Sequence, residues 1–150
     1  GTLCGALNGG LFVLTLARGN CPKAADDLIR WYTQTPLPSR KSESFCRVHN
    51  QPRSVAGSPL CHQSVANWIA ASGNGVHTPE RIDRCAKLTG DTAAYVAEIL
   101  NCAGKGDYKP AASSPEPVSD CLGCHFGLTS VKDDTITKMQ CLDCHDDHRK

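Results

Sequence analysis

The sequence Cys121-Leu122-Gly123-Cys124-His125 is followed, near the carboxyl end of the chain, by Cys141-Leu142-Asp143-Cys144-His145. Both stretches have the pattern C-x-x-C-H, which is typical of covalent haem c attachment. Two thiols at this spacing reach the two vinyl groups on one edge of a porphyrin, and the adjacent imidazole reaches the iron. We therefore predict two c-type haems per chain. The attaching residues would be Cys121, Cys124, Cys141 and Cys144, and the proximal ligands His125 and His145.

A zinc site is the structural alternative for the same four cysteines. Their spacing, C-x2-C-x16-C-x2-C, also occurs in four-cysteine zinc sites. Zinc would explain the four thiols but would leave the histidine after each pair to coincidence, in a chain with 6 His among 150 residues. Haem attachment is therefore favoured. A zinc-and-disulfide module would be recognised by the absence of a Soret band.

The sixth ligand of each haem iron must come from elsewhere, and Met and His are the common choices. The single methionine, Met139, lies two residues before a haem cysteine, which is a poor position for reaching the far face of that haem. His148 follows the module's second motif closely and could reach the other haem. His49 lies in an irregular segment that would let it reach outward. We expect bis-histidine haems with His49 and His148 as distal candidates, although either could be a solvated surface histidine.

The rest of the chain predicts a mainly α fold in two parts. The stretch 103–117 holds three prolines, two glycines and two serines without periodicity, which is typical of a linker. Residues 118–150 contain too few apolar side chains for a core, so the haems must supply one. Residues 1–102 predict a helical domain that contains the scattered cysteines. Its expected helices are Thr2–Arg18, Ala24–Thr33, one from Ser58-Pro59 to Ser72, Thr78–Leu88, and one capped by Asp91. The first helix is expected to stop at Gly19 and Asn20, and the third at Gly73.

Glycines and cysteines in these helices carry further expectations. Gly5, Gly9 and Gly10 each disfavour a helix by about 1 kcal/mol relative to alanine. They suit a place where another backbone or a cofactor approaches closely. Cys61 falls in the first turn of its helix, where the helix dipole favours a thiolate.

Composition limits the partners and the location. The formal net charge is +1 with basic residues spread along the chain, which argues against nucleic acid. No segment has the roughly 18–20 apolar residues that a membrane span requires. The short apolar run Leu11–Ala17 lacks signal-peptide flanks and predicts a buried helix. Because haems of this kind are attached outside the bacterial cytoplasm, we expect a periplasmic protein whose signal peptide has been removed or lies outside this chain.

Six further cysteines contain no C-x-x-C pair, which excludes ferredoxin and zinc-ribbon patterns. If all six formed disulfides, there would be 15 possible connectivities, and the sequence does not choose between them. Metal ligands, disulfides and structural thiols therefore all remain open from chemistry alone. The six are Cys4, Cys21, Cys46, Cys61, Cys85 and Cys102.

A family resemblance narrows these alternatives. The segment 2–10, T-L-C-G-A-L-N-G-G, resembles the CGA-x-x-G segment of the redox-active C_GCAxxG_C_C proteins. Cys61 at a helix start, and Cys85 before a helix that includes 93–100, are similar to that family's two later cysteines. With two C-x-x-C-H motifs appended, the whole chain resembles the split-Soret cytochrome c family.

The resemblance implies an iron–sulfur centre in the helical domain, with Cys4, Cys61 and Cys85 as ligands. It also implies a homodimer whose haems cluster near the interface, with a distal histidine supplied in trans. The roles of the cysteines off the motif stay open. The family has a further cysteine-containing helical segment before its CGA motif, whereas this chain starts at Gly1. Either that segment lies outside the chain or the cluster has fewer protein ligands.

These expectations together predict an electron-transfer protein that serves redox partner proteins, rather than an enzyme. The alternative is a small multihaem reductase, in which one iron lacks a distal ligand and binds substrate. Rapid binding of nitrite, carbon monoxide or cyanide to a high-spin haem would favour the reductase.

Overall fold

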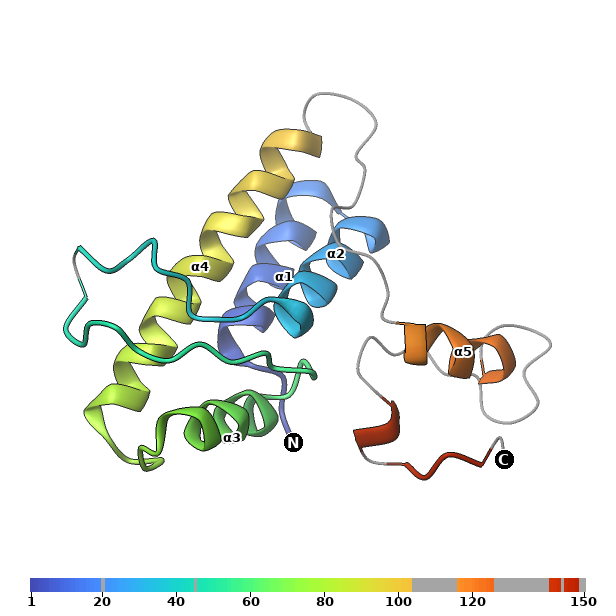
Figure 1. Ribbon diagram of the computed structural model, residues 1–150. Helices are drawn as coiled ribbons and strands as arrows, with labels where there is room; N and C mark the ends of the chain where they lie inside the picture. The colour runs from blue at the N-terminus through green and yellow to red at the C-terminus, as the bar shows by residue number, and fades with distance from the viewer. Residues whose placement is uncertain (20, 45, 104–115, 126–140, 144, 149–150) are drawn as a thin grey trace.

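The computed structural model describes residues 1–19, 21–44, 46–103, 116–125, 141–143 and 145–148. Regular secondary structure in these ranges is helical, without a strand, which confirms the expected mainly α fold (Figure 1). None of the helices described is long and apolar enough to cross a membrane. The elements are α1 (Gly5–Arg18), α2 (Pro22–Gln34), α3 (Cys61–Ser72), α4 (Pro79–Ala103), α5 (Glu116–His125) and the 3-10 helix η1 (Cys141–Asp143).

Helices α1, α2 and α4 pack on one another around an aliphatic core (Figure 1). In α3, Trp68 is fully buried, and its indole N–H donates to the carbonyl of Pro52 at 3.1 Å. This hydrogen bond ties α3 to the long connection that precedes it. The core includes Leu7 and Leu14 from α1, Leu28 and Tyr32 from α2, and Leu88, Val96 and Ile99 from α4.

The long helix α4 corrects the prediction of two helices separated near Asp91. It runs without interruption from Pro79 to Ala103. Asp91 is buried, and its carboxylate accepts hydrogen bonds from the backbone N–H of Ser39, at 2.6 Å, and from the Ser39 hydroxyl. The side chain that suggested an N-cap therefore holds a distant loop instead.

The ends of two helices follow the predicted glycine stops. Gly19 ends α1 and Gly73 ends α3, with φ of 67° and 69°, in the left-handed region that glycine adopts easily. The start of α3 differs by two residues from the expected Pro59. Leu60 is extended and forms an isolated bridge with Leu3, so Cys61 becomes the first helical residue.

Close approach at the glycines of α1 is confined to Gly10. A Cβ placed there would lie 3.0 Å from side-chain atoms of Leu28 and Val96, so α2 and α4 both press on this point. Gly5 and Gly9 have nothing within 4 Å of such an atom. At Gly10 the close approach is made by side chains of the two packed helices and not by another backbone, and the approach of a cofactor at Gly5 and Gly9 stays a prediction.

The module that carries the C-x-x-C-H motifs consists of α5 and η1, which contact each other and lie beside the α1–α4 bundle in Figure 1. Helix α5 begins at Glu116, two residues before the expected start of the module. Most of the expected linker, 104–115, lies outside the described residues. The division into two domains therefore stays a prediction.

Candidate metal centres

Cys4 and Cys61 are held together by paired backbones. The N–H of Cys4 donates to the carbonyl of Pro59, and the N–H of Cys61 donates to the carbonyl of Thr2, both at 2.9 Å. Cys4 directly precedes α1 and Cys61 begins α3. The bridge therefore brings together two thiols that are 57 positions apart in the sequence.

Cys85 of α4 lies near these two thiols. The pKa of Cys61 is raised from its ordinary value of 9.0, first by burial and then by the neighbouring thiols Cys4 and Cys85. Burial and like charge therefore act against the thiolate that the start of a helix favours. The structure brings together the three cysteines that the family resemblance named.

Cys4, Cys61 and Cys85 come from three different parts of the fold, the residue before α1, the start of α3 and the first half of α4, and together they form the three-thiol site.

Two arginines of α4 lie beside the three-thiol site. Arg84 is only 1% exposed and binds α3, donating from Nη2 to the Ser64 hydroxyl at 2.8 Å. Its Nη1 lies 4.0 Å from the sulfur of Cys85, and Nη1 of Arg81 lies 3.9 Å from the same sulfur. A buried cation at this point favours negative charge on the thiols. Sequence analysis missed both arginines, and the adjacent pair Arg84-Cys85 was the one available signal.

Two buried donors near the site lack a partner among the described residues. The Tyr32 hydroxyl is close enough to Cys4 and Ser64 for both to affect its pKa, yet it makes no hydrogen bond of normal geometry. Burial is the main reason that its pKa is raised. The Nε of Arg84 is likewise buried without a partner. Because buried donors normally find acceptors, these two fit a site that holds an additional acceptor, such as the sulfide of an iron–sulfur cluster.

The first C-x-x-C-H motif lies at the end of α5. Cys124 and His125 follow Cys121 by three and four positions, so the helix presents all three on one face. The rings of His125 and His148 meet edge to face, with centroids 5.8 Å apart and planes at 85°. The helix thus places both thiols and the histidine of this motif where one planar group could contact them.

The second motif begins in η1, next to the first. The pKa of Cys141 is raised by burial and then by the neighbouring Cys121, so these two thiols lie close together. The backbone N–H of His145 donates to the carbonyl of Cys141 at 3.0 Å. Cys144, the second predicted haem-attaching cysteine of this motif, lies outside the described residues.

His49 lies in the connection between α2 and α3, together with Cys46 and Glu43. Its side chain is 61% exposed, and its Nδ1 lies 3.5 Å from the sulfur of Cys46. The sequence left Cys46 without a role. The nine cysteines that the structure describes are all free thiols, including Cys21 and Cys102.

Comparison with known proteins decides the family. Residues 1–99, which include the three-thiol site, match the family described as "Putative redox-active protein (C_GCAxxG_C_C)". The chain belongs to the C_GCAxxG_C_C family. This confirms the resemblance drawn from segment 2–10 and the two later cysteines.

The similarity of this C_GCAxxG_C_C chain to a cytochrome extends beyond the family segment. It is 34% identical over 154 residues to the "Split-Soret cytochrome c" of Desulfovibrio desulfuricans (strain ATCC 27774 / DSM 6949 / MB), covering 97% of this chain and 54% of that protein. The solved structure "A novel iron centre in the split-Soret cytochrome c from Desulfovibrio desulfuricans ATCC 27774" matches with a TM-score of 0.86 at 32% identity. That match covers 97% of this chain and 63% of the other. The chain therefore spans about half the length of its curated relative.

Proposed function

We propose that this C_GCAxxG_C_C chain is an electron-transfer protein with two covalently attached c-type haems and an iron–sulfur centre. The haems would be attached at the two C-x-x-C-H motifs, with His125 and His145 as proximal ligands. When bound, both kinds of group accept and release single electrons near neutral pH. The chain's own part is to hold them, exclude water from them and set their potentials.

The observation that carries this proposal is the close pair of histidine rings in the module. Two imidazoles that bind one metal ion from opposite sides have centroids about 6.3 Å apart, for metal–nitrogen bonds of about 2.0 Å. The centroids of His125 and His148 are 5.8 Å apart. We therefore propose His148 as the distal ligand to the haem of His125. For the haem of His145, His49 and a histidine from a second chain are the candidates that sequence analysis left.

The iron–sulfur centre is supported by the three converging thiols and the unpartnered donors around them. Cys4, Cys61 and Cys85 would bind the metal. The guanidinium groups of Arg81 and Arg84 lie next to the Cys85 sulfur and would surround the centre without binding its metal. Positive charge there stabilises the more reduced, more negative state, so both arginines would raise the reduction potential of the centre.

The remaining parts of the proposal concern assembly and location. We propose that residues 1–102 and 118–150 are two domains joined by 103–117, in a homodimer with its haems near the interface. Phe12, Val13 and Leu16 of α1 are exposed apolar side chains that offer a surface for a second copy. A periplasmic location follows from the haem attachment. Light scattering of the holoprotein would test the dimer, and a monomeric mass would contradict it.

Metal and sulfide analysis of the purified protein tests the cofactors. The proposal expects two haems per chain, further non-haem iron and acid-labile sulfide. Two iron atoms per chain without sulfide would contradict the cluster and leave the haems intact. A colourless protein that contains zinc would contradict both haems, and the proximity of Cys121 to Cys141 would then be that of a zinc site.

Ligand binding separates electron transfer from substrate reduction. Bis-histidine haems should be low-spin in both oxidation states and should bind added carbon monoxide, cyanide or nitrite slowly. Rapid binding to a high-spin fraction would contradict the electron carrier and support the multihaem reductase.

A further inference from the structure

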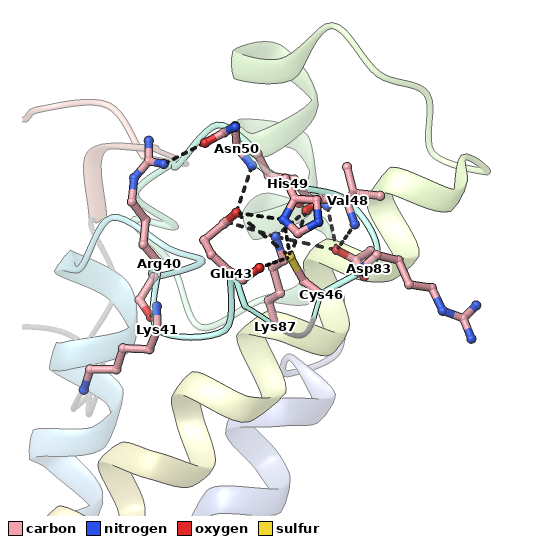
Figure 2. Close-up of polar contacts among 12 residues, drawn as sticks. Arg40, Lys41, Glu43, Cys46, Val48, His49, Asn50, Asp83 and Lys87 are labelled. Atoms are coloured by element: carbon pink, nitrogen blue, oxygen red, sulfur yellow. Dashed lines mark hydrogen bonds and ion pairs between the residues drawn. The ribbon is translucent and has the colours of Figure 1, made fainter.

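The connection between α2 and α3 brings three kinds of metal-binding side chain together. Figure 2 shows Glu43, Cys46 and His49 pointing toward one another above α4. The Cys46 sulfur lies 3.5 Å from His49 Nδ1 and 4.0 Å from Glu43 Oε2, and these last two atoms are 3.6 Å apart. Sequence analysis gave Cys46 no role and placed His49 at a haem.

The size of this triangle matches the needs of one tetrahedral metal ion. With bonds of about 2.3 Å to sulfur and about 2.0–2.1 Å to nitrogen and oxygen, neighbouring ligand atoms lie about 3.3–3.6 Å apart. The three observed distances are within a few tenths of an ångström of these values. We propose that Glu43 Oε2, Cys46 Sγ and His49 Nδ1 bind a divalent transition metal ion, separate from the haems and the three-thiol site.

The Glu43 carboxylate is held ready by the backbone beyond His49. The N–H of Asn50 donates to Glu43 Oε2 at 3.0 Å. Asn50 has φ of 55°, and Arg40 donates to its side-chain oxygen at 3.2 Å. The turn that aims the N–H is thus fixed in an uncommon conformation. Such support around a ligand typically strengthens metal binding.

A buried lysine sets the charge that the site can accept. The ammonium of Lys87 lies 3.2 Å from Glu43 Oε1 and 3.7 Å from Asp83 Oδ2, and it donates to the Val48 carbonyl at 2.6 Å. Two carboxylates and one ammonium leave one net negative charge. A Cys46 thiolate adds a second, and a divalent ion neutralises both.

The same lysine and carboxylate fix the loop on α4. Asp83 accepts hydrogen bonds from the backbone N–H groups of Arg47 and Val48, at 3.2 and 3.4 Å. Cys46 and Lys87 also line a pocket of about 330 Å³ between this loop and α4. The loop that carries the three ligands therefore rests on a helix, and Cys46 borders a space where water could complete the coordination.

The donor set selects the ion. One thiolate, one imidazole and one carboxylate suit zinc or a similar late first-row ion, whereas magnesium and calcium require oxygen ligands. The fourth position would be open to solvent, because the His49 side of the site is exposed. Coordination through Nδ1 leaves a proton on Nε2. His49 is thereby removed from the distal haem ligands, and the haem of His145 must find its partner elsewhere.

Zinc binding by the holoprotein tests the site. After mild chelation that leaves the haems in place, the protein is dialysed against limiting zinc and analysed for zinc per chain. We expect one zinc ion, and X-ray absorption at the zinc edge should report one sulfur with the remaining neighbours nitrogen or oxygen. Cys46→Ala and His49→Ala should each weaken binding by more than the roughly 10- to 100-fold that loss of an outer partner costs. Glu43→Gln keeps the shape of the side chain and should weaken binding in the same direction.

Matched controls assign the result. Cys21→Ala and His77→Ala remove the same side-chain types elsewhere and should leave zinc binding unchanged. Zinc retained by Cys46→Ala, or a zinc spectrum with three or more sulfurs, would overturn the proposal. So would loss of low-spin haem in His49→Ala without an effect on zinc, which would return His49 to the haem. Haem and sulfide content are measured on the same samples, so failure of the proposed redox function would be seen separately.

Discussion

The three-thiol site and the C-x-x-C-H module position their cysteines in opposite ways. Cys4, Cys61 and Cys85 come from segments far apart in the sequence, and a backbone bridge, helix packing and the buried Arg84 bring them together. In the module, each motif supplies its ligands from five consecutive residues. Cys124, His145 and His148 are exposed in the described structure. The packed helices bring the first set of thiols together, whereas we expect the module to form a site only around a bound cofactor.

This difference has a physical origin in what each region can bury. The helices α1, α2 and α4 share an aliphatic core that is sufficient to fix side-chain positions. In the described part of the module, Leu142 is 42% exposed. A porphyrin would offer the module a large apolar surface. The helical bundle should therefore survive cofactor loss, and the module should not.

Loss of one haem is the largest effect that the comparison predicts. The double substitution Cys121→Ala with Cys124→Ala should lower the haem content from two per chain to one, because both thioether bonds are lost. The unfolding free energy of the bundle should change by no more than about 0.5 kcal/mol, as for substitutions outside a packed core. Pyridine haemochrome absorbance and urea unfolding followed by far-ultraviolet circular dichroism measure the two quantities.

A matched variant controls for the loss of thiols as such. Cys102→Ala removes an exposed cysteine of α4 and should leave both haem content and unfolding unchanged. If the bundle instead unfolds when the module loses its haem, the two regions are one cooperative unit and the comparison fails.

From the sequence, the chemistry of the two regions could be predicted better than their three-dimensional structure. The motif pairs, the glycine stops at Gly19 and Gly73, and the helical character of residues 1–102 follow from local patterns. The unbroken α4 does not, because the Asp91 side chain binds a loop 52 positions away. Sequence alone treats such a residue as a cap, since it cannot show the distant partner.

The missed site residues have the same explanation. Arg84 and Tyr32 flank the thiols through packing between helices, and the adjacency of Arg84 to Cys85 was the one sign of this in the sequence. Glu43 and Cys46 gain their proposed role only because the loop folds back on Lys87. A motif for covalent haem attachment consists of consecutive residues and can be recognised in a sequence. A site assembled by tertiary contacts cannot.

The converse substitution should damage the bundle and spare the module. Trp68→Ala empties a fully buried position in α3, and a loss of about 3–5 kcal/mol in unfolding free energy is expected. Because α3 begins with Cys61, non-haem iron and sulfide should also fall, while haem content stays at two per chain. Urea unfolding and metal analysis check both results.

Trp68→Phe separates packing from hydrogen bonding at this position. It keeps most of the ring but loses the bond to the Pro52 carbonyl, so the expected loss is about 1 kcal/mol. Equal losses for the two variants would mean that the indole N–H, and not the filled volume, stabilises α3.

A smaller effect distinguishes the regions at the level of one methyl group. Gly10→Ala should lower the unfolding free energy by about 1–3 kcal/mol, because the new Cβ would lie 3.0 Å from Leu28 and Val96. Gly9→Ala, one residue earlier, meets nothing within 4 Å and should raise stability by up to about 1 kcal/mol.

In the module, Gly123→Ala should change neither haem content nor stability measurably. Nothing lies within 4 Å of its added Cβ, and the second motif has Asp143 at the equivalent position. Thermal unfolding of the three variants ranks them, and a destabilised Gly123→Ala would show packing in the module that the comparison denies.

The smallest predicted effect is a change in the titration of Cys61 after removal of metal. Its pKa is raised first by burial and then by Cys4 and Cys85, while Arg84 and Arg81 act in the opposite direction. Cys85→Ala should therefore lower the pKa of Cys61, and Arg81→Met should raise it further.

The unfolded chain releases the Cys61 proton near the ordinary pKa of 9.0, before the folded chain does. The unfolding free energy should therefore fall as the pH rises through that value. Alkylation of Cys61 with iodoacetamide at increasing pH, followed by peptide mass spectrometry, gives the midpoint in each variant. Unshifted midpoints in both variants would mean that burial alone controls this thiol, and that the three cysteines are too far apart in solution to share a cluster.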